Sequence, residues 1–129
     1  MPQLLRFPRS ARLLDKAAFA RVFDARQRVH SRCFRIHYCP ATPADGQNDR
    51  RTEDGPRLGM AVSRRAASNA VHRNRIRRQI RESFRHARAG LPDADYVVVA
   101  LSAAAQADNR QLRLQLDEAW RRLSDKEPD

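Results

Sequence analysis

A strongly basic stretch between Ser63 and Arg88 constrains the fold of this chain more than any other part of its sequence. It reads SRRAASNAVHRNRIRRQIRESFRHAR and holds nine arginines against one acid, Glu82. Its formal charge is therefore +8, out of +11 for the whole chain of 129 residues. Because so many like charges cannot be buried without partners, the fold must display this segment at its surface.

From about Asn69 to Ala89 the basic stretch has the periodicity of an amphipathic helix. One sector of about 80° on a helical wheel is apolar, the width of a face that packs on a sheet or a second helix. It contains Ile76, Ile80, Phe84 and Ala87. A second sector, about 100° wide, contains Asn74, Arg77, Arg78, Arg81, Arg85 and Arg88.

Both ends of this predicted helix carry boundary residues. Ser68 or Asn69 can cap the amino end with a side-chain oxygen. Gly90, followed by Pro92, predicts a left-handed exit and a stop.

The charge pattern of the predicted helix favours a polyanionic partner over an ordinary solvated face. A solvated face mixes signs so that acids and bases pair at i, i+4, whereas the arginines at 77, 81 and 85 repel one another. Of the 26 basic residues only Lys16 and Lys126 are lysine. Arginine offers forked donors that match phosphates and a plane that stacks on bases, so we predict nucleic-acid binding.

Length and composition predict one soluble domain with a modest core. No apolar run reaches the roughly 18 residues that a spanning helix needs. The amino-terminal MPQLLRFPRS also lacks the apolar centre of a secretion signal. We therefore expect a cytoplasmic protein with no membrane partner.

Two cysteines, Cys33 and Cys39, lie in a segment that the sequence predicts to be extended. Six residues of strand would separate their Cα atoms by about 20 Å, too far for a disulfide. Alternation places both on one strand face with His37, with His30 nearby. A metal site must be considered, but the spacing matches no closed zinc pattern, and half-buried cysteines are the expectation.

The amino-terminal third predicts a basic extended segment over 1–11 and then a helix from Asp15, its cap, to Gln27. Phe19 and Phe23 lie at i, i+4 on this helix. Two interpretations stay open, because such a pair can pack in the core or can line a groove where unpaired bases stack.

The next segments predict two strands separated by a loop. Residues 27–39 alternate, with Phe34, Ile36 and Tyr38 on one face and polar side chains on the other. Residues 40–56 are rich in Pro, Gly, Asp and Asn and predict a flexible loop. Residues 57–63 resume a strand that can pair antiparallel with the previous one.

The carboxy-terminal third predicts a strand and a helix. The unbroken apolar run from Tyr96 to Leu101 is typical of a central strand buried on both faces. Residues 108–123 predict an amphipathic helix, and 124–129 a disordered tail. The inward residues of that helix are Leu112, Leu116, Trp120 and Leu123.

The predicted order gives an α+β sandwich, a small sheet covered by helices. Five segments of this chain resemble the protein subunit of bacterial ribonuclease P. They are NAVHRNRIRRQIRESFR at 69–85, VSRR at 62–65, DYVVVA at 95–100, RLLDKAAFARVF at 12–23 and RCFRI at 32–36. The likeness covers nearly the whole predicted domain, residues 12–123.

The resemblance implies a fold of order α-β-β-β-α-β-α with a left-handed βαβ crossover. It implies that the protein binds one catalytic RNA, 1:1, and the 5′ leader of precursor tRNA, with no small-molecule substrate. It also implies that the holoenzyme is an endoribonuclease that removes the leader. The RNA and its bound Mg²⁺ carry the chemistry, and the protein alone is expected to be inactive.

The resemblance also implies roles for particular residues. Contact with the catalytic RNA is implied for Arg64, Arg65, Arg73, Asn74, Arg75, Arg77, Arg78 and Arg81, and the polar sector adds Arg85. The implied leader-binding cleft consists of Phe19, Phe23, Phe34 and His37. The chain departs from the family pattern at Ser68, at His37, at Leu101 and in the long 40–56 loop.

The residues themselves predict no hydrolytic site, since no serine, histidine and acid grouping and no carboxylate cluster for two metals is present. Three alternatives can be tested. A ribosomal or chaperone-like RNA-binding protein would bind RNA without activating leader cleavage. A helix-turn-helix DNA binder is disfavoured because the basic helix follows a strand. A metal-dependent nuclease would cleave without any RNA partner.

Overall fold

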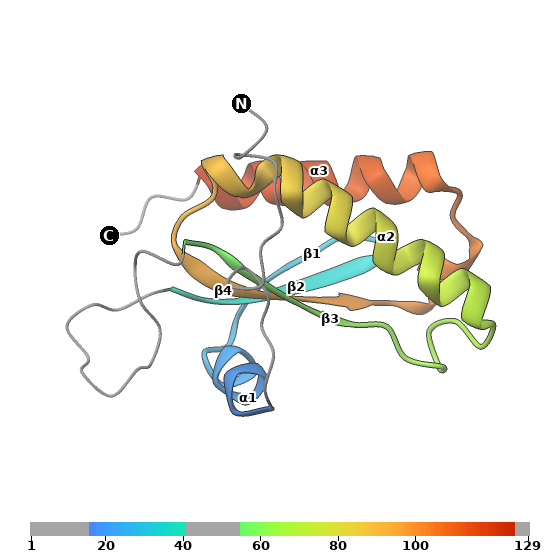
Figure 1. Ribbon diagram of the computed structural model, residues 1–129, viewed down its shortest axis with the longest axis horizontal. Coiled ribbons are helices and arrows are strands. Elements are labelled where there is room, and N and C mark those ends of the chain that lie inside the picture. Colours follow the sequence, from blue (N-terminus) through green and yellow to red (C-terminus); the bar gives the residue numbers. More distant parts are fainter. Residues whose placement is uncertain (1–15, 41–54, 126–129) are drawn as a thin grey trace.

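The computed structural model describes residues 16–40 and 55–125, which form three α-helices around one sheet (Figure 1). The predictions for 1–11, for the Asp15 cap, for most of the 40–56 loop and for 126–129 of the tail lie outside these residues. In chain order the elements are α1 (Lys16–Asp24), β1 (Gln27–His30), β2 (Phe34–Pro40), β3 (Arg57–Ala61), α2 (Ala70–Ala87), η4 (Arg88–Gly90), β4 (Ala94–Ala100), η5 (Ser102–Gln106) and α3 (Asn109–Asp125). The predicted α+β order of elements is confirmed.

β4 is a central strand of the sheet, whose order is β1-β2-β4-β3. It pairs antiparallel with β2 and parallel with β3, and nearly all of its residues are buried. The prediction of a central strand here is confirmed. The predicted antiparallel pairing of residues 57–63 with the previous strand was wrong. The reason is that β4, the most apolar strand, lies between β2 and β3, where both of its faces are covered.

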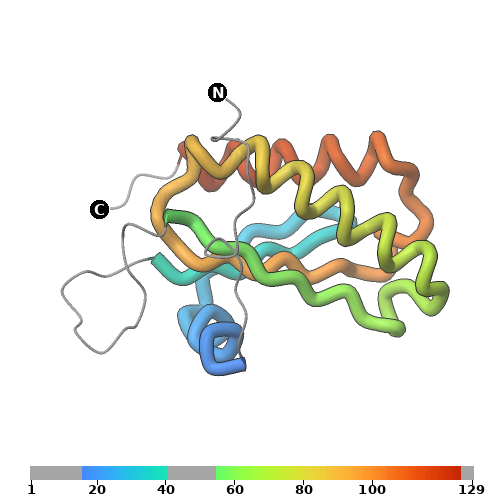
Figure 2. Tube along the Cα trace, viewed as in Figure 1, coloured from blue at the N-terminus to red at the C-terminus, as the bar shows by residue number. Residues whose placement is uncertain are grey.

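The connection from β3 through α2 to β4 is a left-handed crossover. In Figure 1 both strands run from left to right, β3 passes in front of β4, and α2 lies above them. Figure 2 shows the chain rising from β3 into α2 and returning to β4. This hand is uncommon, because about 98% of such crossovers are right-handed.

The segment 27–39, predicted as one extended stretch, is two antiparallel strands joined by a turn at 31–33. Cys33 lies in the turn and is buried in the large core, whereas Cys39 packs on the side of α1. The expectation that Cys33, His37 and Cys39 share one strand face was therefore wrong. Both cysteines are free, and the described part of the chain holds no cluster of three metal-binding side chains.

The sheet has a large core on one face and a small one on the other (Figure 1). α2 and α3 cover the first face, where Phe34 and Trp120 are buried. α1 covers part of the opposite face, where Val22 packs with Val97. The helices on the two faces of the sheet therefore form two different outer surfaces of the protein.

α2 begins as predicted and ends differently. The Asn69 side chain accepts a hydrogen bond from the Val71 backbone N–H at 2.8 Å, which makes Asn69 the N-cap. At the other end the helix tightens into η4, and Gly90 does not adopt a positive φ. The predicted left-handed exit was wrong, because a 3-10 turn already provides partners for the last carbonyls.

α3 packs along α2 with the inward face that the sequence predicts, since Leu112, Leu116, Trp120 and Leu123 are all buried. The Trp120 indole N–H donates to Ser83 Oγ at 2.9 Å. The helix extends to Asp125, so the tail predicted for 124–129 begins too early. None of the described helices is long and apolar enough to cross a membrane.

Candidate RNA interface

α2 separates a buried face from a displayed one, as the sequence predicts. Ile76, Ile80 and Phe84 have no exposed surface. Arg78 and Arg81, on the other side of the helix, are exposed. The apolar residues hold the helix on the sheet, and the charged ones are left for a partner.

The turn before α2 adds two more arginines to the displayed charge. Ala66 and Ala67 are buried, and the Ala66 N–H donates to Ser63 Oγ at 3.2 Å. This anchored turn keeps Arg64 and Arg65 exposed. We define the arginine face as Arg64, Arg65, Arg77, Arg78, Arg81 and Arg85.

Four members of the arginine face have free guanidinium groups. Within residues 16–40 and 55–125, no hydrogen bond or ion pair engages Arg64, Arg65, Arg78 or Arg81. Arg77 is half-buried and donates to Asn74 Oδ1 at 3.2 Å. The exposed donors can therefore meet phosphate oxygens without breaking contacts within the protein.

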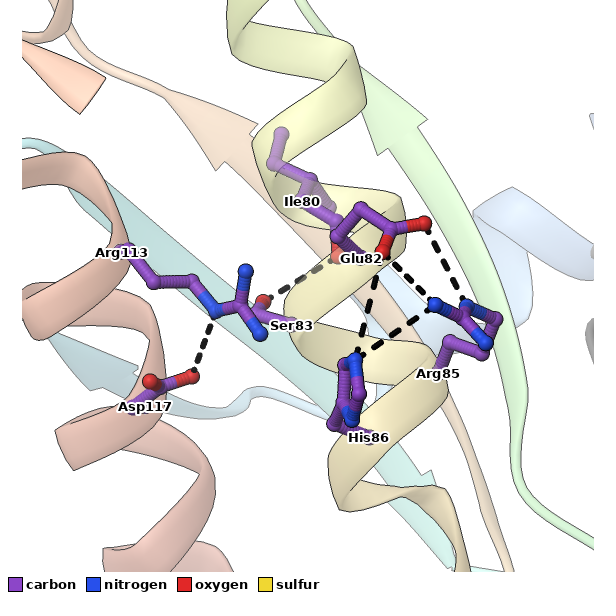
Figure 3. Close-up of polar contacts among 7 residues, drawn as sticks. All are labelled: Ile80, Glu82, Ser83, Arg85, His86, Arg113 and Asp117. Carbon is purple, nitrogen blue, oxygen red and sulfur yellow. Dashed lines mark hydrogen bonds and ion pairs between the residues drawn. The ribbon is translucent and has the colours of Figure 1, made fainter. Parts of the chain in front are cut away.

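Arg85 differs from the rest of the arginine face because Glu82 neutralises it (Figure 3). Arg85 donates two hydrogen bonds to the Glu82 carboxylate, at 2.8 and 3.3 Å. The hydrogen bonds from Arg85 lower the pKa of Glu82, so this carboxylate is ionised at neutral pH. Figure 3 also shows Arg113 of α3 paired with Asp117. The Arg113 Nε–Asp117 Oδ1 distance is 3.2 Å, so α3 carries charges of both signs on its surface.

Two arginines of the predicted RNA-binding set bind the protein itself. Arg73 donates to the carbonyls of residues 67–68, both at 2.9 Å. Arg75 donates to the Ala107 carbonyl and to Asn109 Oδ1, both at 3.0 Å. These bonds fix the start of α2 to the turn before it and to α3. Contact of Arg73 and Arg75 with RNA stays a prediction.

On the opposite face of the sheet, α1 lies over part of a row of cross-strand partners, from His37 through Val97 to Gly59, and exposed Arg28 continues the row on β1. Phe19 rests on Gly59 so closely that a Cβ there would lie 2.6 Å from its ring. Phe23 meets the His37 ring edge-on, with centroids 4.7 Å apart. The helix crosses the sheet from β3 to β2.

The next row of partners lies two residues along each strand, where Val99 packs partly against the small core beneath α1. We call this the open row: His30, Arg35, Val99 and Ala61. His30 is exposed and the other three are half-buried. Arg35 donates to His37 Nε2 at 2.9 Å, which links the open row to the ring beneath Phe23. This part of the sheet combines cationic, apolar and aromatic groups.

His37 is a buried, neutral histidine at the edge of this region. Only 6% of the residue is exposed, and Nδ1 has no hydrogen-bond partner among the described residues. Burial lowers the pKa of His37, and the positive charges of Arg35, Arg28 and His30 lower it further. Since Nε2 accepts from Arg35, the ring proton is on Nδ1.

Three of the four residues predicted for the leader-binding cleft come together, and Phe34 does not. Phe34 is 1% exposed and lies in the large core, on the opposite face of the sheet from His37. It cannot line a surface beside α1, so its prediction was wrong. Phe19 is half-buried on Gly59, whereas 38% of Phe23 is exposed.

Sequence reasoning missed two kinds of residue on this side. Arg35 and His30 border the α1 region, and strand alternation had already placed Arg35 on the same face as His37. Asp95 is fully buried and accepts hydrogen bonds from Arg21 and Arg57. No local pattern identifies that cluster, because its members come from three elements.

This small α+β domain displays the arginine face on one side of its sheet and the open row, with Phe23, on the other. These are the features of an RNA-binding protein. Residues 7–124 match the family model of ribonuclease P. The chain belongs to this family.

Curated relatives and solved structures agree with that assignment. The chain is 44% identical over 108 residues to the ribonuclease P protein component of Xanthomonas campestris pv. campestris, covering 84% of this chain and 66% of that relative. It is 43% identical over 117 residues to that of Halorhodospira halophila, covering 89% and 87%. The chain thus spans just under two thirds of the length of the Xanthomonas relative.

The fold is similar to that of the RNase P protein from Staphylococcus aureus. The TM-score is 0.72 at 28% identity, covering 86% of this chain and 93% of that one. The RNase P protein from Thermotoga maritima shares the fold with a TM-score of 0.68 at 23% identity.

Proposed function

We propose that this chain is a ribonuclease P subunit that binds the catalytic RNA through its arginine face and the 5′ leader of precursor tRNA beside α1. In this way it assists endonucleolytic removal of the leader. The observation that carries the proposal is that exposed arginines before and on α2 and the exposed Phe23 of α1 lie on opposite sides of one sheet (Figure 1).

The arginine face suits the backbone of a structured RNA. Its guanidinium groups repel one another in the free protein, and phosphates relieve that repulsion. If about six phosphates are neutralised, the logarithm of affinity should fall with the logarithm of salt concentration with a slope of about −4 to −5.

The region beside α1 suits a flexible single strand. The exposed edge of Phe23 offers a stacking surface for a base, worth about 1 to 3 kcal/mol. Arg35 and His30 offer donors to the backbone of the same strand. Phe19 supports the helix from below, since its ring is in contact with Gly59.

Along the chain, the two surfaces are nearest at the end of β3. Ala61 closes the open row, and Arg64 follows three residues later, at most about 10 Å along the chain. A leader strand on the open row therefore leads directly to the arginines that contact the catalytic RNA. The protein would thereby align the leader with the RNA that cleaves it.

In this proposal the catalytic RNA carries out the hydrolysis with Mg²⁺ that the RNA binds. The described residues offer no cluster of three carboxylate, histidine or cysteine ligands. Every role assigned to the protein is accordingly one of binding and orientation, in a 1:1 complex. The free cysteines fit the reducing cytoplasm as its location.

Reconstitution tests this function. The protein is mixed with a ribonuclease P RNA and precursor tRNA at low Mg²⁺ concentration, and release of the leader is followed over time. We expect the protein to increase the cleavage rate and to release no leader without the RNA. Tight RNA binding with no increase in rate would favour the alternative, a structural RNA-binding protein.

A matched pair of variants makes the reconstitution specific. Arg78→Ala removes a free cation of the arginine face, and Arg113→Ala removes an equal charge from α3. We expect the Arg78→Ala variant to require more protein for the same cleavage rate and the Arg113→Ala variant to behave like the wild type.

A further inference from the structure

An ion triad around a buried carboxylate joins α1 to the sheet. Asp95 of β4 has no exposed surface. It accepts hydrogen bonds from Arg57 of β3, at 2.7 and 2.8 Å, and from Arg21 of α1, at 2.7 Å. Arg57 and Asp95 are also register partners, so the sheet itself holds the carboxylate. Arg21 is the residue of α1 that contacts this carboxylate.

Arg21 and the two phenylalanines, Phe19 and Phe23, contact the sheet from opposite sides of α1. On a helical wheel Arg21 lies about 160° from both Phe19 and Phe23. The buried Ala18 and Val22 lie between these sides. Rotation of α1 about its axis would therefore break the Arg21 contact and move both rings together.

The apolar contact beneath α1 is small, and apolar burial is non-directional. It consists of the buried Ala18, Val22 and Val97 with a few partly buried neighbours. A buried ion pair adds little net stability compared with apolar packing, but its hydrogen bonds are directional. The ion triad therefore determines orientation more than stability.

We propose that Arg21 and Asp95 are positioning residues, because the ion triad sets the rotation of α1 on the sheet and holds Phe23 against His37 beside the open row. The positioning itself follows from the contacts of the free protein. Its consequence for leader binding rests on the function proposed above.

The first test uses the free protein and two neutral variants. Arg21→Met keeps the length of the side chain without its charge, and Arg21→Gln serves as a second variant. Lys16→Met is the matched control, since it removes the same charge from an exposed position of the same helix. The readout is the proton NMR contact between the rings of Phe23 and His37, whose centroids are 4.7 Å apart.

We expect this ring contact to weaken or disappear in both Arg21 variants and to persist in Lys16→Met. Thermal melts confirm that the variants remain folded, and a loss of stability alone would leave the contact intact in the folded molecules. An unchanged ring contact in a folded Arg21→Met or Arg21→Gln protein would overturn the proposal.

The second test measures precursor and mature tRNA affinity in the holoenzyme. We expect the preference for precursor tRNA to fall about fivefold in Arg21→Met, equivalent to about 1 kcal/mol or one weakly stacked base. It should not change in Lys16→Met. If the ring contact is lost and the preference stays, the positioning role stands and the proposed leader site falls.

Salt dependence separates positioning from direct contact. If Arg21 neutralised a leader phosphate, its removal would reduce the slope of log affinity against log salt concentration by about 0.7. We expect no such change in Arg21→Met, because Arg21 is bonded to Asp95. A reduced slope with an intact ring contact would make Arg21 an RNA ligand and would overturn its positioning role.

Discussion

Replacing Gly59 with alanine tests how closely α1 packs on the sheet. A Cβ at position 59 would lie 2.6 Å from Cζ of Phe19 and 3.0 and 3.2 Å from its two Cε atoms. Carbon atoms in contact are ordinarily about 3.5 to 4.0 Å apart. The Phe19 ring, and the helix that carries it, must therefore retreat by about 1 Å.

The expected cost follows from that overlap. Overpacking of this kind destabilises a protein by about 1 to 3 kcal/mol. Removing a glycine from a strand returns about 0.5 to 1 kcal/mol, since alanine has less freedom to lose on folding. The net loss for Gly59→Ala is thus about 0 to 2.5 kcal/mol, with a middle value of about 1 kcal/mol, or about 3 to 5 °C in Tm for a domain of this size.

The assay is urea unfolding of a double-mutant cycle with Phe19→Leu. The smaller side chain relieves the clash, so in that background we expect Gly59→Ala to be neutral or stabilising. Gly90→Ala is the control, because a Cβ at position 90 meets nothing within 4 Å. An equal loss of stability from Gly59→Ala in both backgrounds would refute the close contact between α1 and the sheet.

Three further predictions concern other parts of the molecule. Arg26 has a φ of 58°, so Arg26→Gly should raise the unfolding free energy in urea by about 0.5 kcal/mol. The lowered pKa of His37 means that below its ordinary value of 6.5 the unfolded chain takes up a proton that the folded chain does not. Stability should therefore fall as the pH decreases from 6.5, and His37→Phe should reduce that fall in urea titrations. Arg81→Ala should weaken RNA binding without changing Tm, whereas Ile80→Asp should unfold the domain; the opposite result would invert the faces of α2.

The sequence predicts those elements whose own residues determine their environment. The two faces of α2, its Asn69 cap and the inward residues of α3 all follow from local periodicity, and the structure confirms them. The apolar run in β4 likewise predicts a strand buried on both faces. In each case the sequence pattern and the helix or strand that it predicts lie within one segment of the chain.

Contacts between distant segments were not predictable in the same way. Nothing in residues 57–63 shows that β4 will lie between β3 and β2. Asp95 reads as an ordinary acid at the start of a strand, and only the fold brings Arg21 and Arg57 to it. The arrangement of α1 depends on these pairings, so it could not be derived from the helix alone.

Phe34 shows where a family resemblance conflicts with a local rule. Side chains alternate along a strand, so Phe34 and His37 must point to opposite faces of the sheet. The resemblance had placed both in one cleft, and the structure follows alternation. Arg35, which shares a face with His37, occupies the position beside α1 instead.

The most direct test of the two-surface account compares Arg78→Ala with Phe23→Leu in the same holoenzyme. For each variant one measures affinity for the catalytic RNA, its dependence on salt, and the ratio of precursor to mature tRNA dissociation constants. We expect Arg78→Ala to weaken RNA assembly and reduce the salt slope by about 0.7 to 0.9, with the tRNA ratio unchanged. Phe23→Leu should leave assembly unchanged and reduce the preference for precursor tRNA about fivefold. If both variants alter both quantities alike, or if Phe23→Leu lowers only Tm, the assignment of two separate RNA surfaces is contradicted.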